Sequence, residues 1–284
     1  MPVSTCYKLM VLRLTTILIL LLGVAEASSR AAGGDVAQIL RGYGFAEAKL
    51  SLKPVNQLLV SAVIGTKPAV LRVSTGSAFS GVYRGKTTAG ATTLSIGGCA
   101  LQGVRLRVLE GGDTADGKLG LDVMEESGAV IDCANQRLFL NARGQSKLAS
   151  AALEKLLSSS GFTRVPLQKR SFLLWVPTIM NEVDWDLCVD TASPLSRINV
   201  GTARAMNVLY RPTAWAVRTG VNRLNQIGSG ELGTFRIGPH RFENSTFTVA
   251  EVFPDVLGAE HLMLNSAIID VGGKKLYLRE RRKP

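Results

Sequence analysis

The sequence predicts a mainly β protein built from two duplicated β-lobes, each preceded by a short helix. Three observations predict this class. Glycine occurs 29 times in 284 residues, so turns are frequent. Val, Ile, Leu and Thr recur between the turns in runs of strand length. Segments of the first half also return in the second half in the same order.

The repeat consists of five matched segments, and chance does not give five matches in one order. We therefore expect two homologous halves, at about 34–145 and 150–280. The pairs are 36–45 with 153–162, 58–73 with 173–189, 74–80 with 190–196, 94–108 with 235–249, and 119–140 with 257–278.

Each half is expected to open with a short amphipathic helix. Both helical segments end at Gly-Phe, and Gly44 and Gly161 are placed as helix stops. Residues 145–160 carry their apolar side chains on one helical face. This segment is therefore predicted as a packed helix rather than a free linker between the halves.

The second segment of each repeat predicts a β-hairpin. Residues 58–73 give two strands joined by Gly65-Thr66-Lys67-Pro68, and residues 173–189 give two strands joined by Asn181-Glu182. Turn residues between two apolar runs are typical of such connections.

The second half carries about 22 extra residues, mostly within 197–232. Gly120 follows Ser74 by 46 positions, whereas Gly258 follows Asp190 by 68. The added stretch is rich in glycine and predicts a longer hairpin. It is either a mobile flap over a site or a solvated surface insertion.

Residues 1–27 have the pattern of a secretory signal peptide. Lys8 and Arg13 precede an apolar run at 14–24, and Ala25-Glu26-Ala27 is a small-residue cleavage site. The run is short for a membrane span, which needs about 20 apolar residues. We expect cleavage after Ala27 and a secreted, periplasmic or cell-envelope protein; an uncleaved anchor is the alternative. No later segment predicts an integral membrane span.

Charge and cysteine content exclude several classes. The net charge is +11, and the basic residues are scattered along the chain except for one small cluster at 279–283. The sequence shows neither basic residues interleaved with aromatics nor a known binding module, so nucleic-acid binding is not expected. Two histidines without a cysteine or carboxylate cluster argue against a metal, and no cofactor is expected. Cys6 leaves with the signal. Cys99, Cys133 and Cys188 then form either one disulfide, Cys99–Cys133, or three buried thiols.

The chemistry-bearing segments are Val189-Asp190-Thr191-Ala192-Ser193 and its counterpart Val73-Ser74-Thr75-Gly76-Ser77. Peptide hydrolysis by carboxylates needs two acids close enough to share a proton, so that one acts as base and the other as acid. A duplicated chain can supply one acid from each half. Here the first half has serine at that position.

On these residues the chain resembles the pepsin/retropepsin-like aspartic protease superfamily, in its short two-lobed, bacterial-style branch. Companion segments strengthen the resemblance, which covers nearly the whole chain after the signal and implies a bilobal acid-protease fold. These segments are Val256-Leu257-Gly258, Lys118-Leu119-Gly120, Ile131-Asp132 leading to Leu140, and Ile269-Asp270 leading to Leu278.

The resemblance implies a role for each residue of the two loops. Asp190 would be the catalytic carboxylate, and Thr191 would tie the loops together across the pseudo-dyad. Ser193 would hydrogen-bond the outer oxygen of the Asp190 carboxylate. Ala192 replaces the commoner glycine, which the family tolerates. In the first half Thr75, Gly76 and Ser77 match the pattern, Ser74 replaces the acid, and Lys118 stands where a hydrophobic residue belongs.

Other candidate residues have simpler interpretations. Asp113-Thr114-Ala115-Asp116-Gly117 lacks a preceding apolar strand and is predicted as a turn. Asp132 and Asp270 each lie between an apolar strand and a turn, and are predicted as hairpin-turn residues. Ser74 as a nucleophile would need His240 or His261 as its base, and the repeat places His240 on a distant hairpin.

The expected function is a secreted, catalytically impaired peptidase fold that binds an extended peptide or unfolded protein between its lobes. One alternative is an active aspartic endopeptidase that uses Asp190 alone or in a homodimer. A second is an envelope-associated binding module whose basic surface meets an anionic polymer. Because each chain supplies both lobes, we expect a monomer with pseudo-twofold symmetry.

Overall fold

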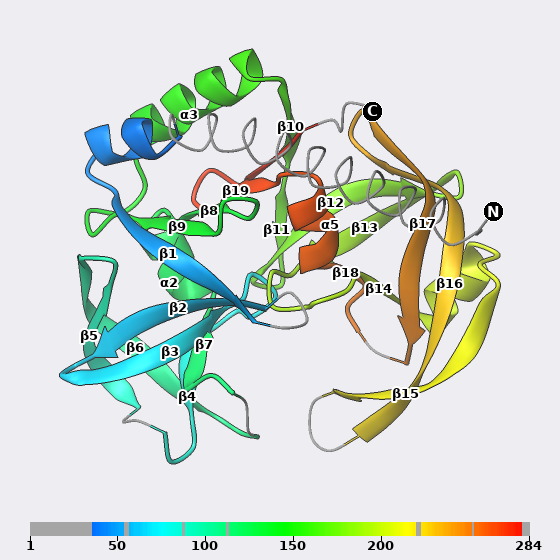
Figure 1. Cartoon of the computed structure of the whole chain (residues 1–284), viewed down its shortest axis with the longest axis horizontal. Coiled ribbons are helices and arrows are strands. Elements are labelled where there is room, and N and C mark those ends of the chain that lie inside the picture. Colours follow the sequence, from blue (N-terminus) through cyan, green and yellow to red (C-terminus); the bar gives the residue numbers. More distant parts are fainter. Residues whose placement is uncertain are drawn as a thin grey trace, which may run out of the picture.

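The computed structural model describes residues 36–53, 57–86, 89–111, 114–219, 223–251 and 253–279. It contains two closed β-barrels and a third sheet to which both halves contribute strands. In Figure 1 the first barrel lies at the lower left, the second at the right, and the third sheet above and between them. The predicted signal peptide falls outside the described residues.

The first barrel consists of six strands from the first half of the chain. It closes because β2 pairs with β3 on one side and with β5 on the other. In barrel order the strands are β2 (Gln57–Ile64), β3 (Lys67–Val73), β7 (Gly117–Leu119), β4 (Gly81–Tyr83), β6 (Cys99–Leu109) and β5 (Gly90–Ile96).

The second barrel has the same connectivity in the second half, closed by the pairing of β12 with β16. Strands β11 (Gln168–Arg170) and β15 (Tyr210–Thr219) extend its sheet beyond the closed barrel. In barrel order the strands are β12 (Leu173–Met180), β13 (Val183–Val189), β18 (Val256–Leu257), β14 (Arg197–Asn199), β17 (His240–Ala250) and β16 (Arg223–Ile237).

The third sheet joins the halves through an antiparallel pair at its centre. Strand β8 pairs with β19, and Ile131 faces Ile269 there, both buried. The sheet order is β10 (Phe162–Pro166), β20 (Lys275–Arg279), β19 (Ile268–Asp270), β8 (Val130–Asp132), β9 (Arg137–Leu140) and β1 (Ala46–Lys53).

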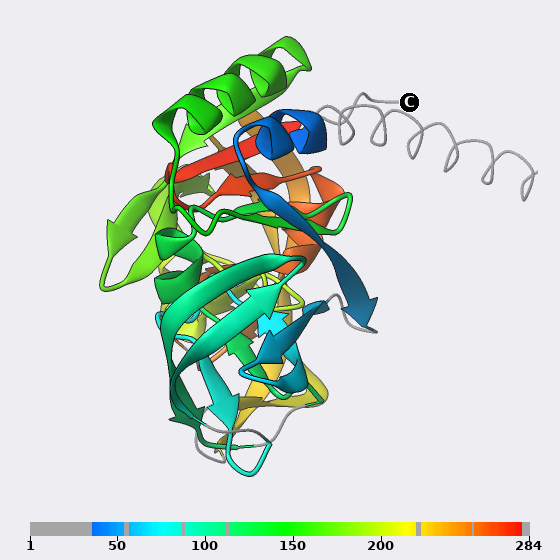
Figure 2. The same ribbon diagram turned by 90° about the vertical axis from the view of Figure 1, so that its left-hand side faces the viewer.

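Two helical segments cover the third sheet and enclose a separate small core. Residues 36–42 are helical, and α3 (Lys147–Ser159) begins at the Ser146 side chain, which accepts a hydrogen bond from Ala149 N. Figure 2 shows both lying on the sheet, on the side away from the first barrel. The side chains in this core include Val36, Leu40, Phe139, Leu153 and Tyr277.

The predicted local structure is largely present. The hairpin turns fall where expected, except that Lys67 and Pro68 already belong to β3. Gly44 and Gly161 adopt the positive φ angles that end a helix. Within the 197–232 insertion the long hairpin β15–β16 is present, but it follows a short helix, α4 (Val200–Ala205), that was not predicted.

The cysteine alternatives resolve in favour of thiols. Cys99, Cys133 and Cys188 are free and buried. Burial raises the pKa of all three, that of Cys188 to about 12. Such thiols are poor nucleophiles, so they act as small apolar groups in the core.

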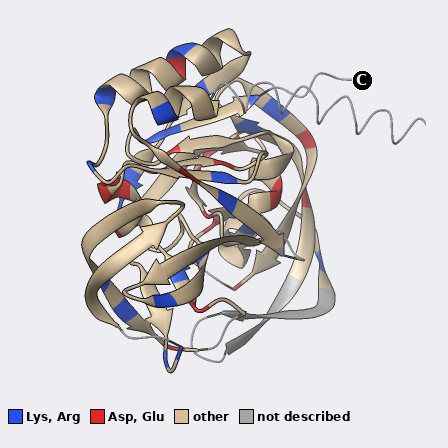
Figure 3. Ribbon diagram, turned by 60° about the vertical axis from the view of Figure 1, so that its left-hand side comes forward, with Lys and Arg blue, Asp and Glu red and all other residues tan. Residues whose placement is uncertain are grey.

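The charged side chains are distributed over the molecule without a large single-sign patch in the view of Figure 3. In the view of Figure 3, Lys and Arg are spread over α3 and the barrels and are interspersed with Asp and Glu. Within the described ranges, no helix has the length and apolar character needed to span a bilayer.

Candidate functional site

The Ser74 and Asp190 loops occupy equivalent places in the two barrels. Each loop follows a barrel strand, β3 or β13, that runs parallel to β7 or β18. Ser74 N donates to Leu119 O at 3.0 Å, and Asp190 N donates to Leu257 O at 3.1 Å. Both loops therefore leave their barrels with the same backbone geometry, as the repeat predicts.

Two threonines join the loops by reciprocal hydrogen bonds. Thr75 N donates to Thr191 Oγ1 at 3.2 Å, and Thr191 N donates to Thr75 Oγ1 at 3.1 Å. Each hydroxyl then donates across the interface, Thr75 to Val189 O at 2.7 Å and Thr191 to Val73 O at 2.8 Å. Both side chains are fully buried, so these four bonds fix the two loops relative to each other.

The threonine contacts bring Ser74 and Asp190 together. Ser74 Oγ lies 3.3 Å from Asp190 Oδ1, to which it donates. Gly76 N and Ala192 N donate to the same oxygen at 3.1 and 2.9 Å. Ser74 is buried and Asp190 is half-buried. The arrangement thus pairs one carboxylate with one hydroxyl at the position where a two-acid site has two carboxylates.

Gly76 approaches the Asp190 carboxylate too closely to carry a side chain. A Cβ at Gly76 would lie 2.3 Å from Asp190 Cγ. The pseudo-twofold relation puts Ala192 in the corresponding place opposite Ser74. Ala192 can therefore carry a methyl group, because the side chain opposite it, Ser74, is small. Gly76 has no side chain, because the larger Asp190 carboxylate lies opposite it.

The expected role of Ser193 is wrong in this structure. Its hydroxyl donates to Leu195 O at 2.9 Å, within its own turn, instead of to the outer oxygen of Asp190. Ser77 does the same with Phe79 O at 3.0 Å. Among the described residues no hydrogen bond reaches Asp190 Oδ2, so all the donors gather on one carboxylate oxygen.

A second duplicated serine supports each loop and was missed in the sequence. Ser80 Oγ accepts from Gly120 N at 2.8 Å, and Ser196 Oγ accepts from Gly258 N at 2.8 Å. In the first half, Asp122 on α2 (Leu121–Glu126) accepts from Ser80 N at 2.8 Å. The signal was present, because both serines occupy the same place in the repeat.

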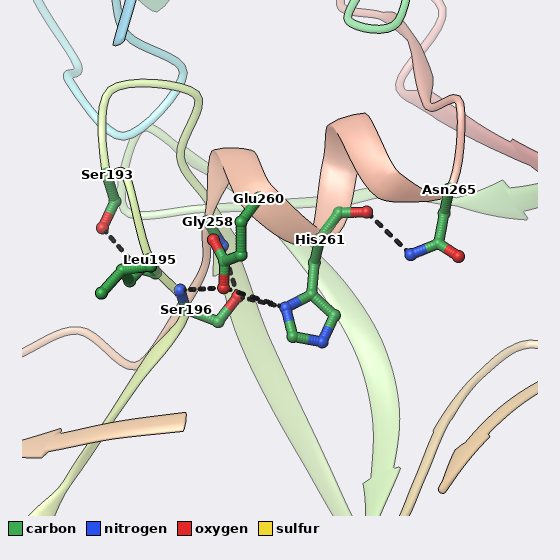
Figure 4. A network of polar contacts seen from close by, with 7 residues as sticks. All are labelled: Ser193, Leu195, Ser196, Gly258, Glu260, His261 and Asn265. Atoms are coloured by element: carbon green, nitrogen blue, oxygen red, sulfur yellow. Dashed lines mark hydrogen bonds and ion pairs between the residues drawn. The ribbon is translucent and has the colours of Figure 1, made fainter. Parts of the chain in front are cut away.

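In the second half, Glu260 on α5 (Ala259–Leu264) replaces that aspartate and accepts from Ser196 N. Burial opposes the ionised form of Glu260, but hydrogen bonds from His261 and Ser196 hold its pKa below its usual value. Figure 4 shows this network around Ser196. The carboxylate thus anchors the Asp190 loop to the helix after it.

The Ser196–His261–Glu260 cluster has the residue types of a hydrolytic triad but not its geometry. Both Ser196 Oγ and Glu260 Oε1 contact the same ring nitrogen, His261 Nδ1, each at 3.0 Å. A triad needs the two ring nitrogens for different partners. Ser196 is also 1% exposed. The cluster therefore supports the fold, and His261 lies against Ser196 rather than Ser74.

The remaining acidic candidates lie at turns, and Asp132 and Asp270 are the last residues of strands β8 and β19. Asp132 Oδ1 accepts from Asn135 N at 3.0 Å and Asp270 Oδ1 from Gly273 N at 2.7 Å, as expected for hairpin-turn residues. Burial raises the pKa of Asp132. Asp116 accepts from Val70 N at 2.9 Å. Asp113 lies outside the described residues.

Lys118 occupies β7 next to the Ser74 loop and is half-buried. Its cross-strand neighbour on β4 is Gly81, whereas the equivalent pair in the second barrel is Val256 with Arg197. The cation and the smaller, uncharged residue have therefore exchanged strands between the barrels. This exchange explains how a lysine fits where a hydrophobic residue was expected.

No protein-family model matches this chain, and no curated protein matches it in sequence. Among solved structures, it is similar to the aspartic proteinase from Irpex lacteus. The TM-score is 0.52 with 14% identity, over 83% of this chain and 97% of that chain. At this identity the likeness shows the fold alone. It confirms the predicted bilobal, pepsin-like architecture.

Proposed function

We propose that this chain, which has the fold of an aspartic proteinase, is a secreted pseudopeptidase that binds extended peptides between its barrels. One observation carries the proposal. A serine hydroxyl lies 3.3 Å from Asp190, where the partner carboxyl group is required, between two loops joined by the threonine hydrogen bonds. The proposed secretion rests on the signal-like residues 1–27.

A serine cannot replace the missing acid. The two-acid mechanism depends on a shared proton, which lets one carboxylate activate water while the other protonates the substrate carbonyl. Loss of one general acid or base typically costs about 10²–10⁴-fold in rate. In groups that act as a unit, losing one member can cost nearly as much as losing all of them.

Peptide binding does not depend on a shared proton, and two observations support it here. Four threonine hydrogen bonds keep the loops in register. Asp190 keeps part of its surface exposed. A peptide recognised mainly through its backbone and side-chain pockets does not need the second carboxylate. We assign the β15–β16 hairpin the role of a cover over the bound peptide.

Restoring the acid tests the proposal. We expect Ser74→Asp alone to gain little, because the pseudo-twofold relation would set the new carboxylate against the Ala192 methyl group, as Gly76 is set against Asp190. Combining Ser74→Asp with Ala192→Gly reproduces the glycine that faces Asp190 and should raise cleavage of unfolded protein at acid pH by about 10²-fold or more. Adding Asp190→Asn to the double variant is the matched control and should abolish the gain.

The unaltered protein provides a second test of the proposal. It should bind pepstatin, a peptide-like inhibitor of aspartic peptidases, without cleaving unfolded protein. Acid proteolysis by the unaltered protein that disappears in Asp190→Asn would instead establish an active endopeptidase. Failure to bind pepstatin, combined with salt-sensitive retention on anionic envelope material, would favour the binding-module alternative.

A further inference from the structure

We propose that a pocket on the second barrel, separate from the Ser74–Asp190 site, binds the cationic head of an alkylammonium ligand. The pocket has a volume of about 450 Å³. Among the residues that the structure describes, its lining is largely aromatic and acidic and includes no Lys or Arg. The lining residues are Trp175, Pro177, Thr178, Asp184, Trp185, Asp186, Phe253 and Asp255.

The pocket lies between the β12–β13 hairpin and the segment that leads into β18. Strand register places Pro177 opposite Asp186 and Thr178 opposite Trp185. Phe253 and Asp255 come from the incoming segment. The pocket is thus formed largely by a hairpin whose strands are paired within the barrel, which favours a preformed site.

The indole rings are held by their N–H groups, so a ligand would meet their π surfaces. Trp185 Nε1 donates to Asp255 Oδ2 at 2.7 Å, and Trp175 Nε1 donates to Arg170 O at 3.1 Å. The Trp175 and Phe253 rings lie 6.4 Å apart at 42°. Phe253 is 83% exposed, which is unusual for so large an apolar side chain. Aromatic surfaces gathered in this way attract cations, quaternary ammonium groups above all.

One carboxylate remains available for a ligand. Asp255 is buried and accepts hydrogen bonds from Trp185, Asn199 and Thr202. Asp186 pairs with Arg170 at 2.6 Å. Asp184 is exposed and makes no ion pair among the described residues. In a chain of net charge +11, an acidic pocket without a lining cation is complementary to a positive ligand.

The first barrel shows that the fold does not require these residues. Strands β2 and β3 correspond to β12 and β13 residue by residue. The counterparts of Trp175, Pro177, Asp184, Trp185 and Asp186 are Leu59, Ser61, Pro68, Ala69 and Val70. None of these is aromatic or acidic, yet the same hairpin forms. The aromatic and acidic set is therefore specific to the second repeat.

Tryptophan fluorescence can measure the binding directly. The chain has three tryptophans, so a Trp215→Phe background leaves only Trp175 and Trp185 as reporters. We expect saturable changes with choline or with the amide of N-acetyl-lysine. 3,3-Dimethylbutanol, the neutral analogue of choline, should give none. The tighter of the two cations identifies a quaternary or a primary ammonium as the preferred head group. No saturable response to either would overturn the proposal.

Exposed positions give variants that should keep the fold. Phe253→Ala and Asp184→Asn should each weaken cation binding by about fivefold or more. Leu209→Ala and Glu243→Gln, also exposed and outside the pocket, are the matched controls and should bind unchanged. Equal binding by all four variants, or equal loss in the controls, would contradict the assignment.

Discussion

At the scale of single residues, the site differs from a two-acid arrangement at two positions. Ser74 replaces an acid in one loop, and Ala192 replaces a glycine in the other. Gly76 faces Asp190, and by the pseudo-twofold relation Ala192 corresponds to it opposite Ser74. The pairing has a steric basis, because the backbone at Gly76 lies against the carboxylate it serves. The size of the side chain at positions 76 and 192 is therefore limited by the residue that lies opposite in the other loop.

Gly76→Ala tests this limit. The added methyl group would lie 2.3 Å from Asp190 Cγ, so the carboxylate or the loop must move. We expect a loss of about 1–3 kcal/mol in the free energy of unfolding, measured by urea denaturation. Ala192→Gly, the reverse change in the other loop, should cost no more than about 1 kcal/mol. Equal effects of the two substitutions would disprove the steric asymmetry.

Thr191→Val tests the junction of the loops. The change keeps the side-chain shape but removes the donor to Val73 O and the acceptor for Thr75 N, both in a buried setting. We expect a loss of about 1–3 kcal/mol in urea denaturation. Thr93→Val, where the hydroxyl bonds an exposed glutamine, is the control and should change stability little. A neutral Thr191→Val would mean that packing alone holds the loops.

At the scale of elements, the sequence predicts hairpins better than it predicts pairing partners. Gly65 and Asn181-Glu182 mark their turns because those positions need a positive φ angle. The six-residue helix α4 leaves no periodic pattern long enough to detect. The bond expected from Ser193 to Asp190 failed because Leu195 O lies within the same turn and takes the hydroxyl.

The contact between the Asp190 loop and α5 should make stability depend on pH. The pKa of Glu260 is lower in the folded state than its ordinary value of 4.5. Its stabilising contribution is therefore complete above about pH 4.5 and is lost as the pH falls through the folded-state pKa. Glu260→Gln should flatten the fall in melting temperature between about pH 5 and 3. Glu243→Gln, an exposed control, should leave that slope unchanged, and an unchanged slope in Glu260→Gln would contradict the anchoring role.

At the scale of the whole molecule, the repeat predicts two halves but not the sheet that joins them. Each half contributes three strands to the third sheet, and only the pairing of β8 with β19 connects the two sets. Neither strand carries a signal for that partner, because both read as ordinary apolar runs before a turn. The pairing follows from the pseudo-twofold packing of complete halves.

Ile269→Ala should reveal this connection. The side chain is fully buried opposite Ile131, and its truncation should cost about 2–5 kcal/mol. Because the sheet belongs to both halves, we expect one calorimetric transition, shifted to lower temperature as a whole. Val108→Ala, at an exposed site on the first barrel, is the control. Two separated transitions in Ile269→Ala would show that the halves unfold independently.

The hairpin β15–β16 belongs to one repeat only, so the two repeats do not present the same surface on either side of the two loops. A twofold-symmetric surface presents the same surroundings to a chain running in either direction. Here the second repeat carries the added hairpin and the carboxylate, and the first repeat carries the serine and no such hairpin. Under the proposed function, a peptide strand and the same strand reversed would therefore meet different surroundings.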